Sequence, residues 1–147
     1  GGEHSQREIE QLQKLALNLK IQDSVTFLGL VKHDQLPYFY NAADACVIPS
    51  YYESFGLVAL ESLACGTPVV AYGCPTGIAE TITPLDPSAV VPPGDVEALA
   101  DALTTRLLAP TDRSLVRAHA FKFDLAQTLV SYVEAFRASL RSDAQNR

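Results

Sequence analysis

Short apolar runs alternate with longer segments in which apolar residues recur every three or four positions. The run at 45–48 shows no polar alternation, which is typical of a parallel strand buried on both faces. Segments such as 5–20 have one apolar face with a helical period. The expected strands are 25–28, 45–48, 68–71 and 89–91. The expected helices are 5–20, 34–43, 54–65, 77–82, 96–108, 112–121 and 125–140.

Residues with known roles at helix ends mark several of these boundaries. Ser54 is expected to cap the helix 54–65, Gly66 to stop it, and Asp95 to cap the helix that follows it. Strands that alternate with helices across short turns predict an α/β fold, with a Rossmann-like parallel sheet and helices on both faces. We expect one domain over 1–141 and a disordered polar tail over 142–147.

Composition narrows the class of protein. The chain has 147 residues, of which 48% are apolar and 19% charged, so it is expected to fold into a globular domain. A net charge of −6 argues against a nucleic-acid surface, and no apolar run is long enough to span a bilayer. The three cysteines and three histidines show no disulfide or metal-site spacing, which favours a reducing, cytoplasmic setting.

Two glutamates are the strongest chemical candidates. No lysine or arginine occurs between positions 33 and 105, yet Glu61 is predicted to lie on an apolar helix face. A buried carboxylate needs partners, because an unpaired one costs several kcal/mol, on the order of an ion's desolvation penalty. One interpretation is an ion pair with a distant base such as Lys20 or Lys32. The other is that Glu61, with Glu53 before the helix, accepts hydrogen bonds from ligand hydroxyls.

The helix start between these glutamates is a candidate anion site. Phe55, Gly56 and Leu57 form its first turn, where unpaired N–H groups and the helix dipole attract anions. Gly56 could open that turn to a phosphate, or only make room for packing. Gly77 also follows a strand and opens a helix, so it could form a second cradle or a simple tight turn.

The segment 49–71 carries a resemblance to a known family. It reads PSYYESFGLVALESLACGTPVVA and places Glu53 and Glu61 in a Glu-x7-Glu motif. This closely resembles the retaining, group 1 glycosyltransferases of the GT-B fold. Further segments are similar to that family along most of the chain: 29–31, 36–44, 76–80 and 90–95.

The resemblance implies a role for each matching residue. Glu53 would be catalytic and contact donor-sugar hydroxyls, and Glu61 would bind the ribose. The backbone of Ser54, Phe55, Gly56 and Leu57 would hold the diphosphate. Gly29, Leu30 and Val31 would line the base. The implied substrate is a nucleotide-diphosphate sugar, with UDP, GDP or ADP as the nucleotide, and no cofactor or metal is implied.

The resemblance also implies what lies beyond these residues. The family's Arg and Lys that clamp the diphosphate, and its acceptor domain, would precede residue 1. We therefore expect the C-terminal donor-binding part of a hexosyltransferase, inactive alone, cytoplasmic or peripheral at the inner membrane face. A sugar, sugar phosphate or lipid would be the acceptor. The turn 76–80 reads TGIAE where the family has Gly-Gly-x-Pro-Glu, which puts its path in doubt.

Two other classes remain open. An epimerase or a retaining phosphorylase could use the same fold, and a non-catalytic nucleotide-binding module could keep the fold without the reaction.

Overall fold

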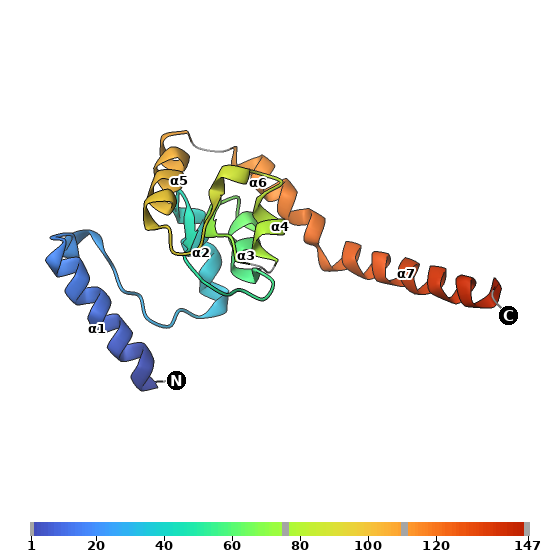
Figure 1. The fold of residues 1–147 in the computed structure, drawn as a ribbon, viewed down its shortest axis with the longest axis horizontal. Helices are drawn as coiled ribbons and strands as arrows, with labels where there is room; N and C mark the ends of the chain where they lie inside the picture. The colour runs from blue at the N-terminus through green and yellow to red at the C-terminus, as the bar shows by residue number, and fades with distance from the viewer. Residues whose placement is uncertain (1, 75–76, 110–111, 146–147) are drawn as a thin grey trace. The chain divides into compact units, whose positions relative to one another are not determined.

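The computed structural model describes residues 2–74, 77–109 and 112–145 (Figure 1). The chain divides into two compact units, Gly1–Gln35 and Leu36–Arg147. The first unit contains the helix α1, Gly2–Asn18, and the short 3-10 turns η1, Gln22–Ser24, and η2, His33–Gln35.

The strand expected at 25–28 is not formed. Val25 has extended backbone angles, but the segment joins none of the sheet ladders among the described residues. Its apolar side chains fit a strand, yet a strand also requires a hydrogen-bonded neighbour, and pattern alone does not supply one.

The second unit is built on a parallel sheet. The strands β1, Cys46–Ile48, β2, Val69–Tyr72, and β3, Val90–Val91, pair in the order β1-β2-β3. Val47 lies opposite Val70, and Tyr72 opposite Val91. The helices and 3-10 turns of this unit are α2 Leu36–Ala42, α3 Leu57–Ala64, α4 Ile78–Ile82, η3 Pro87–Ala89, α5 Val96–Leu108, α6 Arg113–Ala120, η4 Phe121–Phe123 and α7 Leu125–Gln145.

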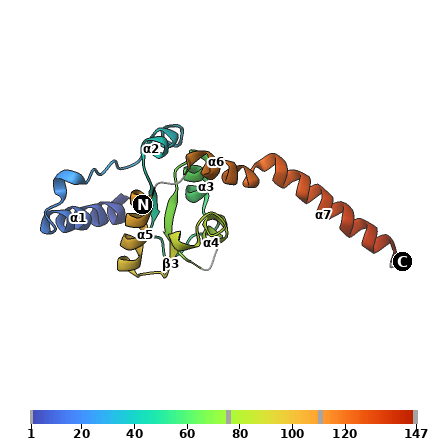
Figure 2. The ribbon, with the colours of Figure 1, turned by 90° about the horizontal axis from the view of Figure 1, so that it is seen from above.

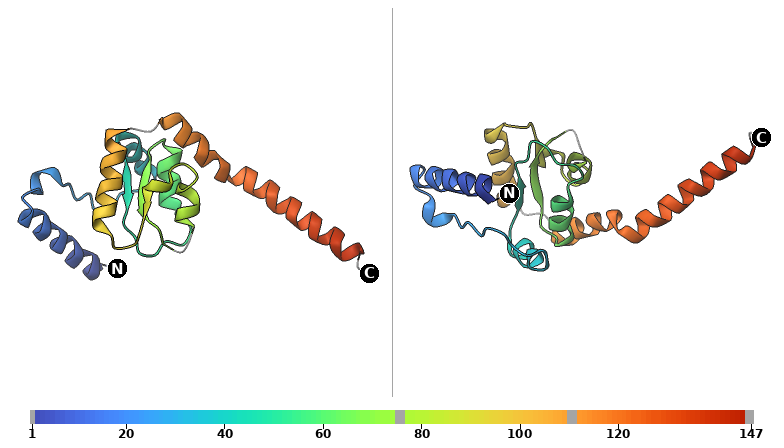
Figure 3. Two further views of the ribbon diagram at one scale, coloured as in Figure 1. Left: turned by 45° about the horizontal axis from the view of Figure 1, so that its top comes forward. Right: turned by 90° about the horizontal axis from the view of Figure 1, so that it is seen from below.

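Helices cover both faces of the sheet. Helix α5 packs on β2 and β3, whereas α3 and α4 pack on the opposite face (Figures 2 and 3). The α/β class with a Rossmann-like parallel sheet, expected from the alternating pattern, is therefore confirmed. The buried core lies around β2, all of whose residues are buried, and includes Leu63, Ile78 and Ile82.

Burial of β1 is less complete than expected. Ile48 is buried in the core, but Val47 keeps 37% of its surface exposed. Successive strand residues face opposite sides of a sheet, so Val47 faces the side opposite Ile48. Helix α5 packs over β2 and β3. The expectation that this strand is buried on both faces is thus wrong at Val47.

Helix boundaries follow the local chemistry, with two corrections. Asp95 caps α5, accepting a hydrogen bond from the Ala98 N–H at 2.9 Å, as expected. Ser54 does not cap α3, which begins later, at Leu57, after Gly56. Helix α7 continues through 142–145, part of the expected tail, because no Gly or Pro interrupts it; 146–147 lie outside the described residues.

The carboxyl end of α3 is closed by Gly66, as expected. Gly66 has a φ of +78°, its N–H donates to the Leu63 carbonyl, and the Thr67 N–H donates to the Ser62 carbonyl. These paired bonds are a Schellman motif, which requires a left-handed residue. A Cβ at Gly66 would lie 2.8 Å from the Arg113 carbonyl oxygen, so glycine is also needed for close approach to α6.

Gly66→Ala should therefore destabilise the protein more than Gly94→Ala. Both glycines have positive φ, but the nearest atom to a Cβ at Gly94 is Tyr51 Oη, at an ordinary 3.4 Å. We expect losses of about 3 kcal/mol and about 1 kcal/mol, since only the first adds a steric clash to the backbone strain. Urea unfolding of both variants measures the difference, and equal losses would contradict it.

Candidate functional site

Loops at the carboxyl ends of the strands meet at one edge of the sheet. A Cβ on Gly77 would lie 3.0 Å from the Phe55 carbonyl oxygen, and one on Gly56 would lie 3.3 Å from Ile78 Cα. The loop after β1 therefore packs directly against the start of α4. Gly56 thus has the packing role left open by the sequence, and Gly77 also permits a close approach of two backbones. Ligands of open α/β sheets bind at this same edge.

Glu53 lies in this loop between two fixed points. On one side, the Tyr51 ring packs on the buried Tyr72 ring at the end of β2, with a centroid distance of 5.7 Å. On the other side, Phe55 packs against Gly77. Glu53 itself is half-buried and makes no hydrogen bond or ion pair with the part of the chain that the structure describes. A carboxylate held this way can accept hydrogen bonds from a ligand.

The start of α3 differs from an ordinary helix start. Gly56, at the N-cap position, has a φ of +81°, and none of the described side chains caps the helix. Ser54, Phe55 and Leu57 are exposed. Backbone N–H groups and the positive end of the dipole therefore meet at the sheet edge beside Glu53, an arrangement that suits an anion.

Glu61 lies one turn further along α3 and is half-buried. The Tyr40 hydroxyl of α2 donates a hydrogen bond to Glu61 Oε2 at 3.3 Å. Burial, followed by the negative charge of Glu61, raises the pKa of Tyr40 from 10.0 to about 12. The phenol therefore stays neutral and keeps its proton for the carboxylate at any physiological pH.

Tyr40 is held in turn by residues outside its own helix. Its carbonyl oxygen accepts hydrogen bonds from Thr67 Oγ1 at 2.5 Å and from Arg113 Nη2 at 3.4 Å. The Arg113 guanidinium also donates to Thr67 Oγ1, at 2.7 Å, and to the carbonyls of Asn41 and Ala43. One arginine of α6 thus closes the carboxyl end of α2.

Arg117 repeats this contact one turn later in α6. Its guanidinium donates to the carbonyls of Ala64, at 3.2 Å, and Cys65, at 3.0 Å, at the carboxyl end of α3. Arginine at a helix carboxyl end neutralises the negative end of the dipole. Sequence reasoning missed Tyr40, Arg113 and Arg117; the four-residue spacing of the arginines on one helix was the available signal.

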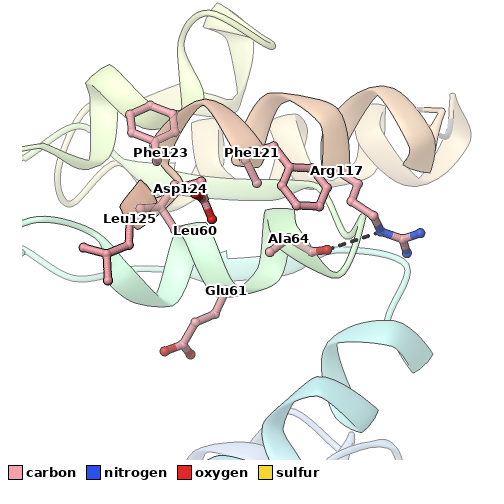
Figure 4. Close-up of a pocket in the computed structure, with 9 residues that line it drawn as sticks. Leu60, Glu61, Ala64, Arg117, Phe121, Phe123, Asp124 and Leu125 are labelled. Carbon is pink, nitrogen blue, oxygen red and sulfur yellow. Dashed lines mark hydrogen bonds between the residues drawn. The ribbon is translucent and has the colours of Figure 1, made fainter. Parts of the chain in front are cut away.

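A pocket of about 330 Å³ lies on the other side of α3 (Figure 4). Its lining residues are Leu60, Glu61, Ala64, Arg117, Ala120, Phe121, Phe123, Asp124 and Leu125. Figure 4 shows the Glu61 side chain leaving α3 on the side opposite Phe121 and Phe123. The carboxylate is therefore directed toward α2 and not into this apolar space.

The described structure leaves the other predicted site residues untested. Gly29, Leu30 and Val31 lie in the first unit, so their contact with a base stays a prediction. Thr76 lies outside the described residues. In the described ranges, no His, Cys, Asp and Glu cluster could hold a metal ion, and no helix has the length and hydropathy to cross a membrane.

Comparison with known proteins gives the family. Residues 1–122 match the family model of the glycosyl transferases group 1. A D-inositol 3-phosphate glycosyltransferase of Mycobacteroides abscessus is 42% identical over 131 residues, covering 85% of this chain and 28% of that protein. The enzyme of the same name from Saccharomonospora viridis is 38% identical over 136 residues, covering 88% and 31%.

A solved structure agrees with the sequence matches. Sucrose-phosphate synthase from Thermosynechococcus elongatus superposes with a TM-score of 0.67 and 35% identity, covering 90% of this chain and 35% of that one. The chain belongs to the group 1 glycosyltransferases, and its fold is of the GT-B type, as the Glu-x7-Glu segment indicated. It spans less than a third of the length of the curated relatives named above.

Arg113→Lys should destabilise the protein by about 2 kcal/mol. The planar guanidinium of arginine donates to several backbone carbonyls and to the Thr67 hydroxyl at once, whereas the single ammonium group of lysine cannot. The matched control is Arg137→Lys on the exposed surface of α7, which should change stability by less than about 0.5 kcal/mol. Chemical unfolding measures both, and equal stability of the two variants would contradict the capping role.

The Tyr40–Glu61 contact also predicts a dependence on alkaline pH. The folded state keeps the Tyr40 proton up to about pH 12, whereas the unfolded chain loses it near 10.0. The stabilisation tied to this proton is therefore complete below pH 10.0 and is lost as the pH rises toward 12. Across that range, the free energy of unfolding of the unaltered chain should fall more steeply with pH than that of Tyr40→Phe. Parallel pH dependences in the two proteins would contradict the Tyr40–Glu61 contact.

Proposed function

We propose that this chain is the donor-binding part of a retaining glycosyltransferase of the hexosyltransferase type. The whole protein would transfer a sugar from a nucleotide-diphosphate sugar to an acceptor hydroxyl. The observation that carries this proposal is the uncapped start of α3, placed between Glu53 and Glu61 at the carboxyl edge of a parallel sheet. Glu53, the helix start and Glu61 would then contact the sugar, the diphosphate and the ribose of the donor, respectively.

Each group has a chemical role in this proposal. Glu53 accepts hydrogen bonds from the donor-sugar hydroxyls and is the catalytic candidate. The backbone of Ser54, Phe55, Gly56 and Leu57 holds the diphosphate, whose negative charge grows as it leaves, so the helix dipole stabilises the departing group. Glu61 binds the ribose. Gly29, Leu30 and Val31 line the base.

Transfer itself requires more than donor binding. The acceptor hydroxyl must be held against the sugar, and positioning of two reactants is a large part of catalysis. We propose that a further domain does this and that the chain alone binds donor without transferring it. Relatives named for D-inositol 3-phosphate make a phosphorylated polyol one candidate acceptor. We further propose metal-independent binding and a cytoplasmic protein, with contact to the inner membrane face in the full-length form.

The two glutamates should separate in a calorimetric titration. Glu53→Ala should weaken binding of the nucleotide sugar but not of the free nucleoside diphosphate, whereas Glu61→Ala should weaken both. The expected loss is about tenfold, from hydrogen bonds to a charged group worth about 1.5 kcal/mol. The probes are UDP, GDP, ADP and their glucose and mannose forms. Each titration is repeated with EDTA, which should not change the affinity if binding is independent of metal ions.

Glu97→Ala is the matched control, because Glu97 is an exposed acid in the first turn of α5. It should bind all probes as the unaltered chain does. No binding of any probe by the unaltered chain would overturn the donor-binding proposal and favour a non-catalytic module. Product analysis of the full-length protein with an added acceptor separates a glycoside from an epimer or a sugar phosphate, the products of the rival enzymes.

A further inference from the structure

We propose that Tyr40 is a positioning residue for Glu61, and that Thr67 and Arg113 hold Tyr40 in place for this purpose. The inference rests on the proposed function, in which Glu61 binds ribose, and adds the groups that orient it. Tyr40 and Arg113 lie outside the segment 49–71 that carries the Glu-x7-Glu motif.

The first step is the contact with the carboxylate. A glutamate side chain on a helix has several rotamers, which place its oxygens in different directions. The Tyr40 hydroxyl donates to Glu61 Oε2 across the α2–α3 contact, at 3.3 Å, and selects one of these orientations. A carboxylate has about four lone-pair sites, so this bond leaves capacity for a ribose diol.

The second step is the anchoring of Tyr40. Its carbonyl oxygen accepts from Thr67 Oγ1 at 2.5 Å, and Arg113 donates to that same Thr67 oxygen at 2.7 Å. Thr67 is fully buried, next to Gly66, and lies just before β2. The last turn of α2 is thus tied to both α6 and the sheet, which fixes where the Tyr40 ring can lie.

The third step is direction. The Glu61 side chain leaves α3 away from Phe121 and Phe123 (Figure 4), and Tyr40 meets it on the α2 side. The ribose is therefore assigned to the α2 side of α3 and not to the apolar pocket against η4. Both the orientation of the carboxylate and the location of the ribose follow from the same hydrogen bond.

The test compares nucleotides with and without the ribose hydroxyls. Tyr40→Phe keeps the ring and removes the donor; Tyr38→Phe, an exposed tyrosine of the same helix, is the matched control. UDP, GDP and ADP, and their 2′,3′-dideoxy forms, are titrated into each 147-residue variant. Tyr40→Phe should bind the ribonucleotides about fivefold more weakly, the effect of one hydrogen bond, and the dideoxy forms unchanged. Tyr38→Phe should match the unaltered chain throughout.

A double variant isolates the coupling. If Tyr40 acts through Glu61, then Tyr40→Phe should add nothing to the loss caused by Glu61→Ala. Thr67→Val should give the same ribose-dependent loss as Tyr40→Phe, and Thr67→Ser should restore binding.

Each contrary outcome has a separate meaning. Equal weakening of ribo- and dideoxynucleotides by Tyr40→Phe, or no weakening of either, overturns the positioning role and leaves the donor site standing. Additive losses in the double variant overturn it as well. Failure of the unaltered chain to bind any of these nucleotides overturns the proposed function, and the role of Tyr40 with it.

Discussion

The contacts of α6 with the carboxyl ends of α2 and α3 hold the second unit's candidate site together. Arg113 and Arg117 lie one turn apart and donate to carbonyl oxygens at the end of α2 and of α3 respectively. Carbonyls at a helix end have no partner within the helix and carry the negative end of its dipole. By satisfying them, α6 fixes both helices, and through them Tyr40 and Glu61, without placing a cation at the sheet edge.

This arrangement gives the two ends of α3 opposite properties. The carboxyl end is closed by Gly66 and by the Arg117 guanidinium, whereas no described side chain caps the amino end after Gly56. The positive end of the dipole therefore meets the carboxyl edge of the sheet, where the loop of Glu53 is pinned against Tyr72 and Gly77. The absence of lysine and arginine between positions 33 and 105 fits this difference between the two ends of α3, because the arginines that stabilise the helices come from α6.

Much of the fold could be predicted from the sequence, and the reasons for the misses are physical. Apolar runs and end signals such as Asp95 and Gly66 are local, so the strands at 45–48, 68–71 and 89–91 and their helices were placed to within a few residues. Residue type alone favours Ser54 as a cap, whereas Gly56, which has a positive φ and lies close to Ile78, takes the N-cap position of α3. The segment 25–28 needed a partner strand that no local pattern reports. Within the site, the Glu-x7-Glu motif indicates Glu53 and Glu61. No motif indicates Tyr40 and Arg113. They lie 21 and 52 residues from Glu61 in the sequence, and only folding brings them close.

The most direct test of the account is a crystal structure of the chain with the nucleoside diphosphate that binds most tightly. The account predicts diphosphate oxygens within about 3 Å of backbone nitrogens at Gly56 and Leu57, at hydrogen-bond distance. It also predicts ribose hydroxyls on Glu61, on the α2 side of α3. A nucleotide bound in the apolar pocket between Phe121 and Leu125, or a diphosphate held by Arg113 and Arg117, would contradict it.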